Sequence, residues 1–145
     1  MKTTICGSFK FLKEIDEAIR ECQGYGIEVL SPRGTKIIGE NEEFLLLEGD
    51  RNTAIKRVED RHLRCIKESD FVLLICPNGY FGVSCAFEIG AALASRVPVF
   101  VMNAPSRLLD GDGPISFCDN VEVVSGIPMI LERLSEITEA STVVL

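Results

Sequence analysis

The sequence predicts an α/β fold, a three-layer α/β/α sandwich of the flavodoxin-like (Rossmann-like) type around a five-stranded parallel sheet. Short β-prone runs alternate along the chain with longer segments whose apolar residues recur at helical spacing, which is typical of βαβ units. The run at residues 71–76, Phe-Val-Leu-Leu-Ile-Cys, is apolar throughout and indicates a strand buried on both faces. Together these observations predict parallel strands joined by right-handed crossovers.

The expected elements follow from local signals along the chain. Strands are expected at residues 3–6, 27–30, 71–76, 97–102 and 121–124. Helices are expected at residues 11–22, at 53–68, around Glu88, and from 127 to about 139. Segment 33–50 is predicted to be a long loop with a helical turn, and residues 103–120 a second loop. For the tail at 141–145, disorder and an edge strand both stay open.

Length, composition and charge narrow the class of protein. The chain has 145 residues, of which 46% are hydrophobic, so a single domain spanning residues 1–145 is expected. The formal net charge is −7, whereas a protein that tracks a nucleic-acid polymer needs a basic surface. A small nucleotide is compatible with this charge, because helix N-termini and loop amides can hold one phosphate.

The six cysteines predict neither a metal site nor disulfides. No two have Cys-x-x-Cys spacing and His62 is the only histidine, so a zinc site is not expected and no cofactor is predicted. Most of the cysteines lie in apolar runs, which favours reduced thiols in an intracellular protein. Charged residues interrupt the first apolar run and no apolar segment approaches membrane-spanning length, so a cytoplasmic protein is expected.

The stretch at residues 79–92 is the most informative one, a glycine turn that runs into a helix carrying one carboxylate, Glu88. It follows the expected central strand, and open α/β sheets bind ligands at such strand–loop–helix junctions. A carboxylate near a helix start gains from the helix dipole and tends to stay ionised, which suits a nucleophile or general base. The alternative is a carboxylate that only complements the dipole and faces water. Spacing alone does not decide between them.

Four further residues are weaker candidates. Asp70 stands at the start of its strand, the far edge of the sheet, where the pattern favours a structural role. Ser8 follows the first strand and is expected either to donate to a phosphate or to close the turn. Cys85 is a rival nucleophile, because a helix start lowers the pKa of a thiol. His62 lies on the apolar stripe of its helix, which favours a buried histidine with its hydrogen bonds satisfied.

Four short motifs, taken in order, resemble one enzyme family. The motifs are Ile5-Cys-Gly-Ser8, Lys67-Glu-Ser-Asp70, Gly82-x5-Glu88-Ile-Gly-x-Ala92 and Asp119-Asn120-Val121. In this order the sequence resembles the nucleoside 2-deoxyribosyltransferases and their relatives, which include the 2′-deoxynucleoside 5′-phosphate N-hydrolases. The resemblance spans most of the chain and implies the same five-stranded parallel sheet.

The resemblance also implies an activity and a set of site residues. It implies cleavage or transfer of the N-glycosidic bond of a (deoxy)nucleoside or nucleoside 5′-monophosphate through a covalent glycosyl intermediate on Glu88. Asp70 would orient the nucleophile or the sugar, or help to protonate the leaving base. Asn120 would reach into the neighbouring subunit's pocket in a homodimer or larger homo-oligomer. The residues expected to hold sugar, phosphate or base are Gly7, Ser8, Gly79, Tyr80, Gly82 and Ser84.

Two positions depart from the transferases. Gly82 stands where they carry an aspartate that holds the sugar 5′-hydroxyl, and Ile5 stands where they carry a tyrosine. The sequence does not decide whether the enzyme is a hydrolase or a transferase. It also leaves open which base is recognised, whether the sugar is ribose or deoxyribose, and whether a 5′-phosphate is needed. The two departures also motivate an alternative of another class, a catalytically silent nucleotide-binding or sensor module of the same fold. A third alternative is a thiol-dependent enzyme that uses Cys85.

Overall fold

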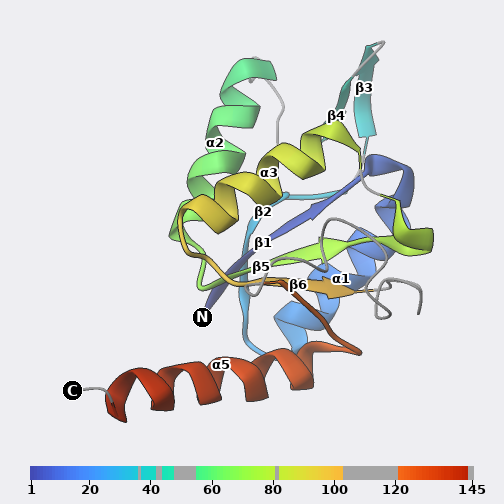
Figure 1. Cartoon of the computed structure of the whole chain (residues 1–145). Coiled ribbons are helices and arrows are strands. Elements are labelled where there is room, and N and C mark those ends of the chain that lie inside the picture. The colour runs from blue at the N-terminus through green and yellow to red at the C-terminus, as the bar shows by residue number, and fades with distance from the viewer. Residues whose placement is uncertain (36, 42–43, 48–54, 81, 103–120, 144–145) are drawn as a thin grey trace.

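Five parallel strands form the central sheet, in the order β2-β1-β5-β6-β7 (Figure 1). In the computed structural model these strands are β1 (Lys2–Gly7), β2 (Glu28–Ser31), β5 (Phe71–Ile75), β6 (Val99–Met102) and β7 (Val121–Val123). Every neighbouring pair is parallel, which confirms the expected flavodoxin-like sheet. The structure describes residues 1–35, 37–41, 44–47, 55–80, 82–102 and 121–143.

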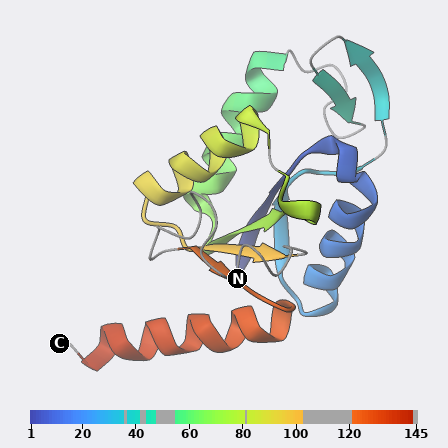
Figure 2. The ribbon, with the colours of Figure 1, turned by 45° about the vertical axis from the view of Figure 1, so that its right-hand side comes forward.

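Helices cover both faces of the sheet and complete the three layers (Figure 2). A core cluster on one face joins the sheet to α1 (Leu12–Gly24) and α5 (Ile127–Val143). The cluster on the other face joins it to α2 (Ile55–Glu68) and α3 (Val83–Ala94). Among the described residues, no helix combines the length and apolar character that crossing a membrane requires.

The central strand β5 shows why an unbroken apolar run becomes a buried strand. Its side chains alternate between the two faces, with Phe71, Leu73 and Ile75 in the α1/α5 cluster and Val72 and Leu74 in the α2/α3 cluster. All five residues are buried. Both faces therefore select apolar side chains, as the sequence pattern predicts.

Two local expectations were wrong. The segment expected to be a loop with a helical turn instead contains an antiparallel pair, β3 (Ile37–Asn41) and β4 (Phe44–Leu47). A short apolar run does not distinguish a helical turn from a strand by periodicity, which accounts for the error. A 3₁₀ turn, η1 (Phe9–Phe11), precedes α1, and α5 continues to Val143, so residues 141–143 form neither an edge strand nor a disordered tail. The expected loop at 103–120 lies outside the described residues.

Candidate functional site

Glu88 lies in the second turn of α3, on the side that faces α2. The turn η3 (Pro77–Gly79) follows β5, and Gly82 is the N-cap residue of α3. The side chain of Glu88 is only 12% exposed, and its Oε1 lies 3.5 Å from Nε2 of His62. This position does not fit a carboxylate that merely faces water at a helix start.

Three segments that are distant in the sequence meet at Glu88. Cys6 comes from the carboxyl half of β1 and His62 from α2, and Cys6 Sγ lies 3.6 Å from His62 Nε2. The other ring nitrogen, Nδ1, lies 2.6 Å from Oγ of Ser31, the buried last residue of β2. The expectation that His62 is a satisfied, mostly buried histidine agrees with these contacts. The sequence did not predict that it lies beside Glu88.

The surroundings of this site raise the pKa values of two side chains, Glu59 and Cys6. Burial raises the pKa of Glu59 above its ordinary value, and the charge of Glu88 raises it further, whereas His62 lowers it. Glu59 therefore keeps its proton to a higher pH than an ordinary glutamate. Burial and the neighbouring Glu88 also raise the pKa of the Cys6 thiol well above its usual range, which keeps that sulfur protonated.

Three residues of this candidate site were not expected from the sequence, namely Cys6, Ser31 and Glu59, and His62 was expected only as a buried histidine. Glu59 and His62 are three residues apart on α2 and share one helix face, a pattern visible in the sequence. Cys6 and Ser31 carried no comparable signal, because only the pairing of β1 with β2 and β5 brings their strand ends to α2.

A second group of residues joins the loop after β1 to the loop after β5. Lys10 Nζ lies 3.5 Å from the hydroxyl of Tyr80 and 4.7 Å from the centre of its ring. Phe11 packs edge-on against the same ring, with centroids 6.0 Å apart. The Tyr80 hydroxyl also approaches Gly82, where an added Cβ would lie 3.7 Å from it. Tyr80 thus packs across the loops and remains 42% exposed.

The other predicted binding residues have mixed positions. Ser8 is the N-cap of η1 and accepts a hydrogen bond from the Lys10 backbone N–H, so it closes the turn. Gly7 lies where β1 and β5 approach each other closely, since an added Cβ would lie 3.3 Å from the carbonyl oxygen of Ile75. Gly79 has a φ of +73°, which favours glycine, and Ser84 is exposed in the first turn of α3. Asn120 lies outside the described residues.

The structure does not bring Asp70 to Glu88, so the role that the resemblance implied for it does not fit its position. Asp70 precedes β5 at the amino edge of the sheet, where its Oδ2 accepts a 2.7 Å hydrogen bond from the backbone N–H of Lys2. The register places Lys2 four residues before Cys6 on β1, a separation of about 13 Å along the strand. The carboxylate holds the start of β1 to the start of β5, which is a structural role.

Cys85 does not fit the role of nucleophile. It is buried on α3, and burial together with the negative charge of Glu88 raises the pKa of its thiol to about 11. The helix start that was expected to lower this pKa is outweighed by these two effects.

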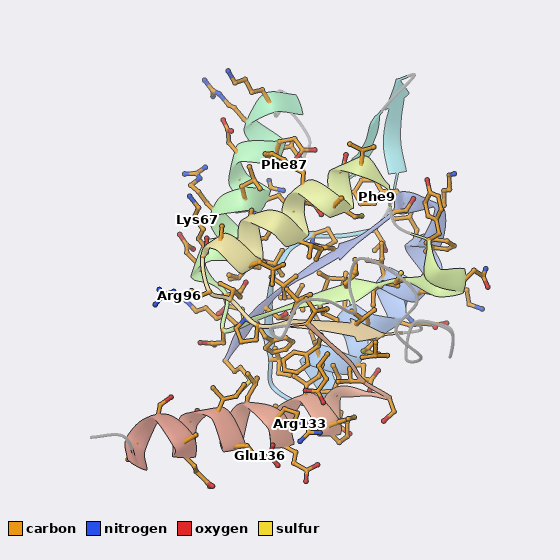
Figure 3. The ribbon with its side chains drawn as sticks, in the orientation of Figure 1. Phe9, Lys67, Phe87, Arg96, Arg133 and Glu136 are labelled. Carbon is orange, nitrogen blue, oxygen red and sulfur yellow. The ribbon has the colours of Figure 1, made fainter. Side chains whose placement is uncertain are left out.

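The hollow along the outer side of α2 is separate from these groups. It has a volume of about 570 Å³ and is lined by Arg57, Asp60, Leu63, Arg64 and Lys67. Figure 3 shows Lys67 at the edge of the molecule, on the outer side of α2. None of the predicted site residues lines this hollow, so we place the candidate site at Glu88.

Comparison with known proteins supports the fold. No protein-family model and no curated protein sequence matches the chain. Among solved structures, the chain is similar to the CMP N-glycosidase BcmB of Clostridium botulinum, with a TM-score of 0.53 and 17% sequence identity. The match covers 95% of this chain and 99% of that one. At this identity the likeness concerns the three-layer α/β fold, which the two chains share over nearly their whole length.

Proposed function

We propose that this protein is an enzyme that cleaves or transfers the N-glycosidic bond of a nucleoside or nucleoside 5′-monophosphate, with Glu88 as its nucleophile. The observation that carries the proposal is the mostly buried position of Glu88 beside His62, together with a nearby carboxyl group, Glu59, whose pKa is raised by burial and by the charge of Glu88. Retaining glycosidases use two carboxyl groups, one as nucleophile and one as acid, and a raised pKa suits the acid. The fold shared with a CMP N-glycosidase supports the same reaction class.

The chemistry divides between the two carboxyl groups. Glu88 attacks the anomeric carbon as the bond to the base breaks, and a glycosyl ester on Glu88 forms. Glu59, whose raised pKa suits a general acid, donates a proton to the departing base, which replaces the role that the resemblance gave to Asp70. Water, or a second base, then attacks the ester and releases the sugar. His62, 3.5 Å from Glu88 and held by Ser31, orients the nucleophile.

The loops around Tyr80 are the proposed binding surface for sugar, base and phosphate. Lys10 places a cation beside Tyr80 in a protein whose net charge is −7. A cation there attracts an anionic substrate, which favours a nucleoside 5′-monophosphate over a free nucleoside. The turn amides at Gly79 and Gly82 and the hydroxyls of the loop serines would complete the contacts, and the ring of Tyr80 would cover the base.

A homodimer or larger homo-oligomer is part of the proposal. Val83 and Phe87, one turn apart on α3, are 90% and 66% exposed, and Phe87 is labelled on α3 in Figure 3. Exposed apolar side chains next to Glu88 provide a surface that a second copy would cover. In such an assembly Asn120 would enter the neighbouring subunit's site. Dissociation by Phe87→Glu, followed by light scattering, tests this part separately.

The test is release of free base from a panel of substrates. Purified protein is incubated with CMP, dCMP, other nucleoside 5′-monophosphates and the matching nucleosides, and free base is measured by chromatography. We expect release from at least one nucleotide, and its loss in Glu88→Gln but not in Glu132→Gln, a control at an exposed glutamate on α5. If ligands raise the melting temperature but no base is released, the protein is the silent binding module and not an enzyme.

A further inference from the structure

The Cys6, His62 and Glu88 side chains bring a sulfur, a nitrogen and an oxygen donor together in one place. These three donor atoms all lie within 4.8 Å of one another. Thiolate, imidazole and carboxylate are the ligands that Zn²⁺ takes in proteins, and catalytic or exchangeable zinc sites use three protein ligands with the fourth position open. We propose that Cys6, His62 and Glu88 form a binding site for a divalent cation of the zinc class.

The distances between the donors match those around one tetrahedral ion. Zn–S bonds of about 2.3 Å and Zn–N or Zn–O bonds of about 2.0–2.1 Å place pairs of donors about 3.3–3.6 Å apart. Cys6 Sγ and His62 Nε2 are 3.6 Å apart, and His62 Nε2 and Glu88 Oε1 are 3.5 Å apart. The third pair, Cys6 and Glu88, has donor atoms within 4.8 Å of each other.

The surroundings of His62 are those of a metal ligand. Its Nδ1 lies 2.6 Å from Ser31 Oγ, so a second contact fixes the ring while Nε2 points at Cys6 and Glu88. Ligating histidines in metalloproteins use the second ring nitrogen in this way, and this outer contact determines ring orientation and basicity.

Charge and access also favour a divalent cation. A Cys6 thiolate and a Glu88 carboxylate carry two negative charges, which balance one Zn²⁺. As the metal binds, the Cys6 S–H bond is replaced by a metal–sulfur bond and the proton leaves to the solvent. His62 and Glu88 are 14% and 12% exposed, so an ion can enter from their side while Cys6 closes the inner side.

Occupation of this site has a consequence for the proposed enzyme. A Glu88 carboxylate bonded to the metal is no longer free to attack an anomeric carbon. Zinc would therefore act as a reversible inhibitor that competes with substrate. This consequence rests on the proposed function, whereas metal binding itself does not depend on it.

The test of binding uses Co²⁺ as a spectroscopic substitute for Zn²⁺. Reduced full-length protein, freed of reductant, is titrated with Co²⁺ while its absorption spectrum is recorded. We expect one equivalent to produce a near-ultraviolet thiolate-to-cobalt charge-transfer band together with the intense visible bands of tetrahedral Co²⁺, and we expect Zn²⁺ to remove both. A titration without a charge-transfer band overturns the proposal.

Matched variants locate the site. Cys6→Ser should lose the charge-transfer band, while Cys65→Ser, which removes a thiol that contacts the carbonyl oxygen of Leu30 instead, should keep it. His62→Gln changes a more exposed residue, so it covers the case in which Cys6→Ser fails to fold, and it should also lose the tetrahedral bands. Ser31→Ala should weaken Co²⁺ binding about 10- to 100-fold. A band that persists in both Cys6→Ser and His62→Gln would place the metal elsewhere and overturn the proposal.

A separate measurement addresses inhibition. Once a substrate that releases base is known, Zn²⁺ should raise its apparent KM and a chelator should restore the original rate. If Co²⁺ binds as expected but no substrate is turned over, the metal site stands and the glycosidase proposal fails. If base is released and the cobalt bands are absent, the glycosidase proposal stands and the metal-site proposal fails.

Discussion

The imidazole of His62 connects the last residue of β2 to Glu88, with Nδ1 2.6 Å from Ser31 Oγ and Nε2 3.5 Å from Glu88 Oε1. This arrangement fixes the carboxylate on α3 relative to the sheet, since the histidine is held from α2 and the serine from β2. Positioning groups of this kind hold a nucleophile in the geometry that it needs in the transition state.

Glu59→Gln is expected to lower kcat by about 10²- to 10⁴-fold, the usual contribution of a general acid. Burial and the charge of Glu88 raise the pKa of Glu59, against the lowering effect of His62, so the wild-type acid keeps its proton to a higher pH than an ordinary glutamate. Activity of the wild type should therefore fall as pH rises through the pKa of Glu59, and this limb should vanish in the variant. Glu68→Gln, an exposed glutamate on the same helix, is the control.

The substrate used separates this role from a structural one. A glycoside whose leaving group needs no proton, such as a p-nitrophenyl glycoside, should react with Glu59→Gln nearly as fast as with the wild type. Equal losses on both kinds of substrate would contradict the assignment of Glu59 as the acid.

Cys85→Ala is expected to retain at least half of the wild-type activity. Because burial and Glu88 raise the pKa of Cys85 to about 11, only about one thiol in a thousand is ionised at pH 8. Iodoacetamide at that pH should leave Cys85 unlabelled for hours, as read by peptide mass spectrometry. Rapid labelling of Cys85 in step with loss of activity would support the thiol-dependent alternative instead.

Asp70→Ala should lower stability without lowering activity. The variant loses the 2.7 Å hydrogen bond from the Lys2 backbone N–H, and because the site is exposed we expect a loss of about 1 kcal/mol. A chain of this size should then melt about 3–5 °C lower in a thermal scan. A large fall in kcat with an unchanged melting temperature would restore the catalytic role that the family resemblance implied.

Lys10→Gln should distinguish nucleotides from nucleosides. If Lys10 attracts the 5′-phosphate, its loss should raise KM for a nucleoside 5′-monophosphate about 10-fold, roughly 1.4 kcal/mol, and leave KM for the free nucleoside unchanged. Lys13→Gln removes an equally exposed cation from the neighbouring helix and should change neither value. An equal effect of both variants would indicate general charge attraction and not a contact with the phosphate.

The sequence predicts the sheet well because burial on both faces leaves a strong local signal. The apolar run at 71–76 predicts an inner strand, and all five residues of β5 are buried. The segment 37–47 lacked such a signal, since its short apolar run at Phe44–Leu47 fits a turn of helix and a strand equally well. The tail at 141–145 was similarly ambiguous from its sequence, so the continuation of α5 to Val143 was not predicted.

The site was predicted only in part. Glu88 was found because its glycine turn marks a junction of strand and helix, and such junctions recur at ligand sites. Cys6, His62 and Ser31 were missed because their proximity depends on how β1, β2 and α2 assemble, and residues 6, 31 and 62 carry no common spacing. Spacing rules detect metal ligands from one segment and not from three, so the cluster of Cys6, His62 and Glu88 gave no signal in the sequence either.

The most direct test of the central claim is intact-protein mass spectrometry during turnover of a panel of nucleosides and nucleoside 5′-monophosphates, CMP and dCMP included. We expect an adduct with the mass of the sugar or sugar phosphate, mapped to Glu88 by peptide fragmentation, together with free base. The adduct should be absent in Glu88→Gln. Base release without any adduct on Glu88 would contradict the covalent mechanism, and binding without base release would contradict the assignment of an enzyme.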